Sequence, residues 1–309
     1  MDFENIIYTV DDGIATIKLN RPKALNALNT EINQDIMAAL KLVQADESVR
    51  VLILTGSERA FAAGADVKEM AEATPRYARE FSGLAIEINN LLESMPIPTI
   101  AAVCGFAFGG GFEMPLACDF RIGGPRTMLA FPECGLGIIP GANGCARATA
   151  LVGAAKAKEL VMLSDPAHPI TGQEAYDLGL LNWYVTGDAS LNAAAAEAKK
   201  AAKIAKKNGA SEDEVKAAKA AGKAAEAAAA KSEYDAIYAK AVEVANRLKA
   251  RPACALAAAK TAINKAAIET VAAGKAAETT EFTLLFDTHD QKEGMAAMIE
   301  KRTAVFTNS

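Results

Sequence analysis

The chain has 309 residues, 51% of them apolar, and a formal net charge of −5 at neutral pH. That length and apolar content are enough to bury a large core in one domain, or in one domain with an appendage. The negative balance argues against a protein whose overall field recruits nucleic acid or an anionic membrane surface. No apolar run approaches the roughly 20 residues that span a bilayer, and the acidic first residues resemble no signal or transit peptide, so we expect a cytoplasmic protein.

The chain has too few paired cysteines and too few histidines for a typical zinc site or a His-based catalytic triad. The five cysteines occur singly, with no CxxC pair, which indicates reduced thiols rather than disulfides or a zinc site. Only His168 and His289 could supply an imidazole. We therefore expect no metal site and no His-based catalytic triad.

The first ninety residues predict alternating strands and helices. Residues 6–10 and 14–19 alternate around an Asp-Gly turn, which predicts a β-hairpin. A helix is expected from residue 29 onward, because apolar side chains recur there at helical spacing. Residues 51–55 form a continuous apolar run, typical of a strand covered on both faces, and a further helix is expected over 75–92. Short joins between such elements indicate an α/β layered fold.

A glycine-rich segment follows the next strand, predicted over 100–103. Three glycines at 109–111 precede a helix-like apolar run that carries Glu113 in its first turn. Glycines allow close approach of a ligand, and the first N–H groups of a helix lack partners within it. A carboxylate beside such donors suits acid–base catalysis, but a tight turn with a capping glutamate explains the same residues equally well.

Glycine recurs after a strand predicted over 120–122 and the stretch that follows at 128–133. Glu133 follows a proline there, so we expect it in an irregular segment, where a lone surface glutamate is an alternative explanation. A helix is expected over 144–163. A short helix and a strand over 170–185 complete the α/β part.

Six motifs, in order and with matching separations, resemble those of the enoyl-CoA hydratase/isomerase (crotonase) superfamily. They lie at residues 21–28, 61–70, 105–113, 131–133, 137–141 and 290–302. The resemblance covers residues 3–187 and 240–306. It implies a repeated ββα spiral core, a helical C-terminal trimerisation region, and a homo-oligomer that is a trimer or a dimer of trimers.

The resemblance also implies the chemistry. Members of this family bind an acyl-CoA thioester and polarise its carbonyl with two backbone N–H groups, at positions that match Ala65 and Gly110. Hydratases carry two glutamates, which match Glu113 and Glu133. We expect Glu113 to be the base that activates water and Glu133 to be the protonated acid that supplies a proton to Cα. Gly141 matches a position whose N–H helps to position the second glutamate.

The resemblance further implies contacts with coenzyme A, which is part of the substrate, and no separate cofactor. One subunit is expected to contribute residues of two segments: Lys23, Ala24 and Leu25, and Ala63, Asp66, Val67 and Lys68. Met298 and Lys301 match positions that in relatives reach the CoA phosphates of a neighbouring subunit. A solvated surface position explains each lysine as well.

Two residues and one segment depart from the family pattern. Phe131 stands where many hydratases have glutamine, and Asn143 replaces a usual glycine, which puts the shape of the acyl pocket in question. Residues 189–231 are an insertion with twenty alanines and nine lysines against five acidic residues. Strong helix formers, a glycine cap after Asn208 and a capping box from Ser211 to Glu214 predict a helical hairpin. We therefore expect three parts: a core at 1–188, the insertion at 189–231 and a C-terminal helical region at 232–309.

Two other functions remain as alternatives. A Δ3,Δ2-enoyl-CoA isomerase would usually keep an acid only at the second position, so the intact pair of glutamates favours a hydratase. An RNA-binding or scaffold protein would use the lysine-rich hairpin, but the lysines lack interleaved aromatic or arginine residues. A dinucleotide-binding site is excluded because the glycines do not form GxGxxG.

Overall fold

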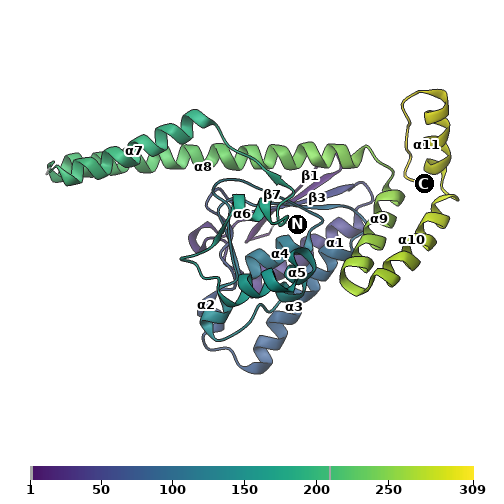
Figure 1. Cartoon of the computed structure of the whole chain (residues 1–309), viewed down its shortest axis with the longest axis horizontal. Coiled ribbons are helices and arrows are strands. Elements are labelled where there is room, and N and C mark those ends of the chain that lie inside the picture. Colours follow the sequence, from purple (N-terminus) through teal and green to yellow (C-terminus); the bar gives the residue numbers. More distant parts are fainter. Residues whose placement is uncertain (1–2, 209) are drawn as a thin grey trace.

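The computed structural model describes residues 3–208 and 210–309, and it has an α/β body from which a long helical hairpin projects (Figure 1). The body contains two sheets, with strand orders β1-β2-β3-β5-β7-β10 and β4-β6-β8-β9. The larger sheet consists of β1 (Ile6–Asp11), β2 (Ile14–Leu19), β3 (Val51–Thr55), β5 (Thr99–Ala102), β7 (Phe120–Gly123) and β10 (Trp183–Tyr184). The smaller consists of β4 (Ala60–Ala62), β6 (Phe106–Phe108), β8 (Met128–Ala130) and β9 (Ile170–Thr171).

Helices cover the sheets and continue into the C-terminal region. The α-helices are α1 (Thr30–Ala45), α2 (Val67–Met70), α3 (Pro75–Ser94), α4 (Gly110–Ala117), α5 (Gly144–Met162), α6 (Gly172–Asp177), α7 (Ala189–Lys207), α8 (Glu212–Lys249), α9 (Ala253–Asn264), α10 (Val271–Leu285) and α11 (His289–Glu300). Two 3-10 turns, η1 (Pro22–Ala24) and η2 (Pro132–Leu136), and one π-helical turn, η3 (Lys265–Glu269), complete the set.

Three successive units of the body repeat one order of elements: a strand of the larger sheet, a strand of the smaller sheet, then a helix. They are β3–β4–α3, β5–β6–α4 and β7–β8–α5, with the short α2 inside the first unit. Equivalent strands of these units pair in parallel. The expected ββα spiral is therefore confirmed, and the loops that follow β4 and β6 leave the smaller sheet at the same edge.

The predicted N-terminal hairpin is confirmed, with Asp11 opposite Ile14 in an antiparallel pair. Asp12 and Gly13 form its turn with φ of 45° and 74°. Two consecutive positive φ values give the primed turn whose twist matches that of paired strands, and glycine adopts such angles without steric cost.

The core lies on both faces of the larger sheet, as the continuous apolar run of β3 predicts. Leu52 and Leu54 face the cluster beneath α1, α3 and α4, whereas Val51 and Ile53 face a second cluster. That second cluster includes Ile237 and neighbouring side chains of α8. The C-terminal half of α8 therefore covers one face of the larger sheet.

The predicted helical hairpin is confirmed as α7 and the first half of α8, which extend together beyond the body (Figure 1). Ser211 and Glu214 form the predicted capping box at the start of α8. The predicted glycine cap at residue 209 lies outside the described residues. Helix α8 continues without a break through residue 231, so the domain boundary expected there lies inside one helix and stays a prediction.

The helix predicted over 144–163 is interrupted, which the apolar spacing does not indicate. Gly153 has φ 77° and ψ 161°, so two helical segments meet at a kink within α5. Residues with a Cβ atom rarely adopt this backbone conformation because of steric clash, whereas glycine adopts it readily.

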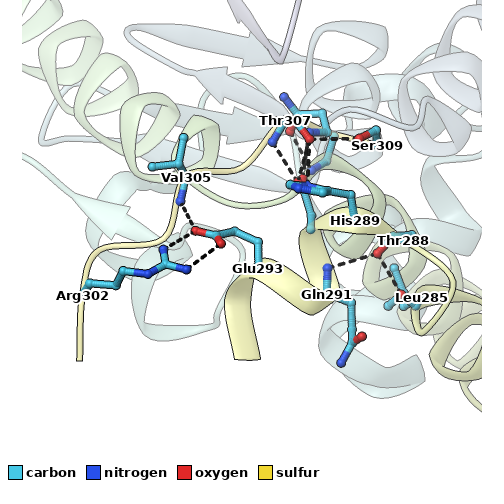
Figure 2. A network of polar contacts seen from close by, with 12 residues as sticks. Leu285, Thr288, His289, Gln291, Glu293, Arg302, Val305, Thr307 and Ser309 are labelled. Carbon is cyan, nitrogen blue, oxygen red and sulfur yellow. Dashed lines mark hydrogen bonds and ion pairs between the residues drawn. The ribbon is translucent and has the colours of Figure 1, made fainter. Parts of the chain in front are cut away.

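The C-terminal helices form an arc at one end of the molecule, and the last residues fold back onto α11 (Figures 1 and 2). Glu293 accepts hydrogen bonds from both terminal nitrogens of Arg302, at 2.6 and 2.8 Å, and from Val305 N at 2.8 Å. Asp290 accepts from Thr307 N and Asn308 N, each at 2.8 Å. The tail is thus held to α11 by charge-assisted hydrogen bonds.

Candidate active site

Two glycine-containing loops meet at the edge of the smaller sheet. Gly64 follows β4 with φ 99°, and Gly109 follows β6 with φ 51°. A Cβ atom on Gly109 would lie 3.8 Å from the Cα of Gly64. The two backbones therefore touch where the parallel strands end, and both carry conformations that favour glycine.

Each loop presents a backbone N–H that has no acceptor among residues 3–208 and 210–309. The backbone groups on either side of Ala65 N have partners. Gly64 O accepts from Leu28 N at 2.7 Å, and Asp66 N donates to Leu28 O at 2.8 Å. Gly110 is the first residue of α4, where a helix provides no internal acceptor for the amide. Ala65 N and Gly110 N are thus two donors, from separate loops, without an acceptor in the described residues, and their role in polarising a carbonyl stays a prediction.

Glu113 lies in the first turn of α4 with only 3% of its surface exposed. Its Oε1 accepts hydrogen bonds from Ala142 N and Gly144 N, both at 2.8 Å. Burial raises the pKa of this carboxyl, and the two amide donors and the charge of Arg147 oppose that rise. Its Oε2 lies close to the first residue of α4, since a Cβ on Gly110 would lie 3.8 Å from it.

Glu133 approaches the same point from η2, with 8% of its surface exposed. A Cβ on Gly109 would lie 2.5 Å from its Oε1, so a larger residue there would displace the carboxyl. Its buried Oε2 has no partner within the described part of the chain. Burial, with the nearby charge of Glu113, raises the pKa of Glu133 to about 7. The interpretation of Glu133 as a lone surface residue is therefore wrong.

The two glutamates differ in what their surroundings favour. Glu113 receives two N–H donors and a nearby guanidinium, which stabilise a carboxylate. Glu133 has one oxygen without a donor and a neighbouring acidic group, which favour the protonated form. Of the pair, Glu133 therefore holds a proton more readily near neutral pH.

Gly141 is near this site, but its contact differs from the expected one. Its carbonyl accepts a hydrogen bond from Ser82 Oγ at 2.5 Å, whereas the next amide, Ala142 N, is the one that reaches a glutamate, and that glutamate is Glu113. No hydrogen bond joins Gly141 N to Glu133 in the described residues. Ala142 and Gly144 were not foreseen from the sequence, since only the folded loop shows which amides face the carboxylate.

The residues expected to contact coenzyme A fall into two groups. Residues 23–25 lie against residues 63–68, because Ala63 N donates to Leu25 O at 3.1 Å. Asp66 is already engaged: its carboxylate pairs with Arg21 at 3.0 Å and accepts from Lys68 N at 3.2 Å. Val67 is 61% exposed, and the lysines at 23 and 68 are exposed as well, so this rim is open to a ligand.

Met298 and Lys301 lie far from this rim in the same chain. They belong to α11 and its end, which lie on the other side of the α/β body from α2 (Figure 1). Met298 is 81% exposed. Any contact of theirs with this kind of site requires a second subunit, so their role stays a prediction.

A cavity of about 370 Å³ lies elsewhere, between the far end of α4 and helices α5 and α9. Its wall includes the ion pair of Lys260 with Asp119, at 2.8 Å, and mostly apolar side chains. Neither glutamate lines it, so this cavity is separate from the candidate active site.

The described residues contain neither a candidate metal cluster nor a candidate membrane-spanning helix. In residues 3–208 and 210–309, no group of three or more His, Cys, Asp or Glu is placed to hold a metal ion. None of the helices in those ranges is both long enough and apolar enough to cross a membrane.

Comparison with known proteins identifies one family. A family profile described as enoyl-CoA hydratase/isomerase matches residues 9–236. The chain is 35% identical to a protein named crotonyl-CoA hydratase from Syntrophomonas wolfei, with 99% of each chain covered. It is 32% identical to a short-chain-enoyl-CoA hydratase from Clostridium acetobutylicum, covering 98% of this chain and 97% of the relative. A crystal structure described as an enoyl-CoA hydratase subunit from Geobacillus kaustophilus superposes with a TM-score of 0.79 at 32% identity, over 100% of both chains.

Proposed function

This chain belongs to the enoyl-CoA hydratase/isomerase family, with the crotonase fold, and we propose that it adds water to trans-2-enoyl-CoA to give 3-hydroxyacyl-CoA. The observation that carries the proposal is one arrangement. Two buried carboxyl groups, Glu113 and Glu133, flank two backbone donors, Ala65 N and Gly110 N, that no protein atom of the described residues occupies.

The two amides would bind the thioester oxygen of the substrate. Attack at Cβ moves electrons through the conjugated system onto that oxygen, so donors already in place stabilise the enolate as it forms. Loss of one such donor typically costs about 10²–10³ in rate. The glycines at 64 and 109 serve this step because their positive φ values bring the two loops together.

Glu113 is assigned as the base. As a carboxylate it would take a proton from water while the water oxygen bonds to Cβ. The amides of Ala142 and Gly144 hold one of its oxygens, which leaves Oε2, close to Gly110, for the water.

Glu133 is assigned as the acid. In its protonated form it gives its proton to Cα of the enolate, which restores the thioester carbonyl and leaves Glu133 as a carboxylate. Release to solvent of the proton that Glu113 took from water, and uptake of a solvent proton by Glu133, return both groups to their starting forms. Both carboxyls approach from the side of Gly109 and Gly110, so hydroxyl and proton would add to the same face of the double bond. This is a syn addition.

A Δ3,Δ2-enoyl-CoA isomerase is the second candidate within the family. Isomerisation moves one proton from one carbon to another, for which a single carboxyl is enough. The buried and hydrogen-bonded Glu113 would have no task in that reaction, which is why we favour hydration.

We further propose a homo-oligomer, either a trimer or a dimer of trimers, that works in the cytoplasm with no cofactor besides the coenzyme A of its substrate. Large apolar side chains exposed on the C-terminal helices support the association, among them Phe282, Leu284, Met298 and Ile299. Exposed apolar patches of this kind mark protein interfaces. A neighbouring subunit would then bring Met298 and Lys301 to the coenzyme A rim of another.

Turnover of short, long, branched and cyclic enoyl-CoA substrates by wild type, Glu113→Gln and Glu133→Gln tests the proposal. Each variant is expected to lose hydration by about 10²–10⁴-fold, as for a positioned acid or base. An exposed glutamate on α3, Glu87, provides the matched control Glu87→Gln, which should retain full activity. Full activity of either active-site variant would remove that residue from the mechanism.

A further inference from the structure

Helix α3 carries two polar side chains that reach the loop holding the catalytic base and a third that reaches Arg147. Ser82, Asn89 and Glu93 are spaced i, i+7 and i+11, which places them along one side of the helix. Asn89 is buried, with 2% of its surface exposed, in a helix face that otherwise packs into the core. A buried amide in such a place is costly unless it is hydrogen-bonded.

The carbonyls of residues 141 and 142 accept hydrogen bonds from side chains of α3 and from Arg147 of α5. Ser82 Oγ donates to Gly141 O at 2.5 Å, and Asn89 Nδ2 donates to Ala142 O at 3.1 Å. Arg147 Nη1 donates to the same Ala142 oxygen, also at 3.1 Å. Both carbonyls are therefore fixed in direction, and the peptide planes that contain them are fixed with them.

The opposite edge of the same loop faces Glu113. Ala142 N shares a peptide plane with Gly141 O, and it donates to Glu113 Oε1 at 2.8 Å, as does Gly144 N. Asn143, between the two donors, has φ 68° and ψ 21°. A left-handed residue between amides lets N–H groups converge on one anion. Holding Gly141 O therefore aims Ala142 N directly. Ala142 O lies in the next peptide plane, so Asn89 and Arg147 fix the backbone between the two donating amides.

Arg147 is itself held by α3. Its guanidinium forms paired hydrogen bonds with the Glu93 carboxylate, both at 3.1 Å, and its Nη2 also donates to Asn90 at 3.1 Å. The side chain is 7% exposed. A paired arginine–carboxylate contact fixes the plane of the guanidinium, so its bond to Ala142 O has a defined direction.

We propose that Asn89 and Ser82 are positioning residues for hydration: by holding the carbonyls of residues 141 and 142, they keep two amides on Glu113 Oε1 and so keep its second oxygen aimed at water. The inference rests on the function proposed above. It also accounts for Phe131, a buried ring against Phe112 that offers Glu113 no hydrogen bond, since this loop supplies the donors instead.

The ionisable groups around Glu113 set the sign of the expected pH effect. Arg147 on α5 lowers the pKa of Glu113, and Glu133 on η2 is a neighbouring acid whose own pKa is raised by Glu113. The thiol of Cys145, also on α5, feels the charges of both glutamates. Amides that bind a carboxylate lower its pKa, so a displaced loop raises the pKa of Glu113.

The test uses Asn89→Leu and Ser82→Ala in the full-length chain, with crotonyl-CoA as the probe substrate. For Asn89→Leu we expect kcat to fall about 10–100-fold, as for a small misplacement of a reacting group, while KM changes less than about twofold. The acidic limb of the kcat–pH profile should move upward by about half to one pH unit, the equivalent of one hydrogen bond. Ser82→Ala should show the same two changes to a smaller extent, and Ser82→Thr, which keeps the hydroxyl, should restore them.

Two results separate this inference from the function on which it rests. If Glu113→Gln abolishes hydration but Asn89→Leu and Ser82→Ala keep the wild-type pH profile, the positioning role is wrong and the hydratase proposal stands. If Glu113→Gln retains hydration, both are wrong. If circular dichroism shows that Asn89→Leu does not fold, the variants of the partly exposed Ser82 decide the question. A Ser82→Ala enzyme with unchanged kcat and an unchanged acidic limb of its pH profile then overturns the inference. Glu87→Gln, on the exposed side of α3, is the control for changes in that helix.

Discussion

Replacing Glu133 by glutamine should stabilise the fold at alkaline pH while it removes the acid of the reaction. The pKa of this carboxyl rises from 4.5 to about 7 on folding, because the group is buried and close to Glu113. Between those two values the unfolded chain has lost the proton while the folded chain retains it. The free energy of unfolding therefore falls as pH rises through this window. From the two pKa values, the fall attributable to Glu133 between pH 5 and pH 8 is about 2.5 kcal/mol.

The assay is urea unfolding of wild type and Glu133→Gln at pH 5 and pH 8, at one fixed protein concentration. Glutamine matches the carboxyl in size and does not titrate, so the variant lacks this contribution. We expect the difference in unfolding free energy between variant and wild type to move in favour of the variant by about 2.5 kcal/mol from pH 5 to pH 8. An equal difference at both pH values would show that Glu133 titrates normally, and the assignment of Glu133 as the protonated acid would then lose its physical basis.

Three further predictions concern the Gly109 loop, the ion pair of Arg126 with Glu233 and the outer part of the helical hairpin. Gly109→Ala should reduce kcat by at least about 10²-fold, because the new Cβ would lie 2.5 Å from Glu133 Oε1 and residue 109 has φ 51°. Steady-state kinetics that match wild type would refute the packing described for Glu133. Arg126→Ala should lower the free energy of unfolding by about 3 kcal/mol, since it leaves the fully buried carboxylate of Glu233 without the guanidinium that lies 2.7 Å away. Chemical denaturation measures this free energy, and a loss below about 1 kcal/mol would contradict the prediction. Replacing residues 199–222 by a short turn should leave kcat/KM within about twofold of wild type, as expected for a surface segment away from the site. Salt-sensitive retention of RNA by the full chain that this deletion removes would instead support the RNA-binding alternative.

Local sequence patterns predicted the elements whose causes are local. The Asp-Gly turn after β1, the capping box at Ser211 and the doubly covered strand β3 each follow from residues within a few positions of one another. The strands β4, β6 and β9 were not predicted, because each has three residues or fewer and pairs only with distant segments. The kink at Gly153 was missed because the apolar spacing continues across it.

The candidate site likewise contains some residues that the sequence indicated and others that it did not. The sequence indicated Glu113 and Gly110 because a glycine cluster before a helix has a direct backbone meaning, and the resemblance to a family added Glu133 and Ala65. It did not indicate Asn89, since a single asparagine in an amphipathic helix gives no sign of which carbonyl it will reach across 53 positions. Contacts of this kind depend on how α3 packs against the loop, and local pattern carries no information about that packing.

The most direct test of the central claim is a crystal structure of Glu133→Gln with a bound trans-2-enoyl-CoA. The account predicts that the thioester oxygen lies within about 3 Å of both Ala65 N and Gly110 N, with a water held between Glu113 and Cβ of the substrate. A thioester oxygen bound elsewhere, with those two amides still free or facing solvent, would contradict it.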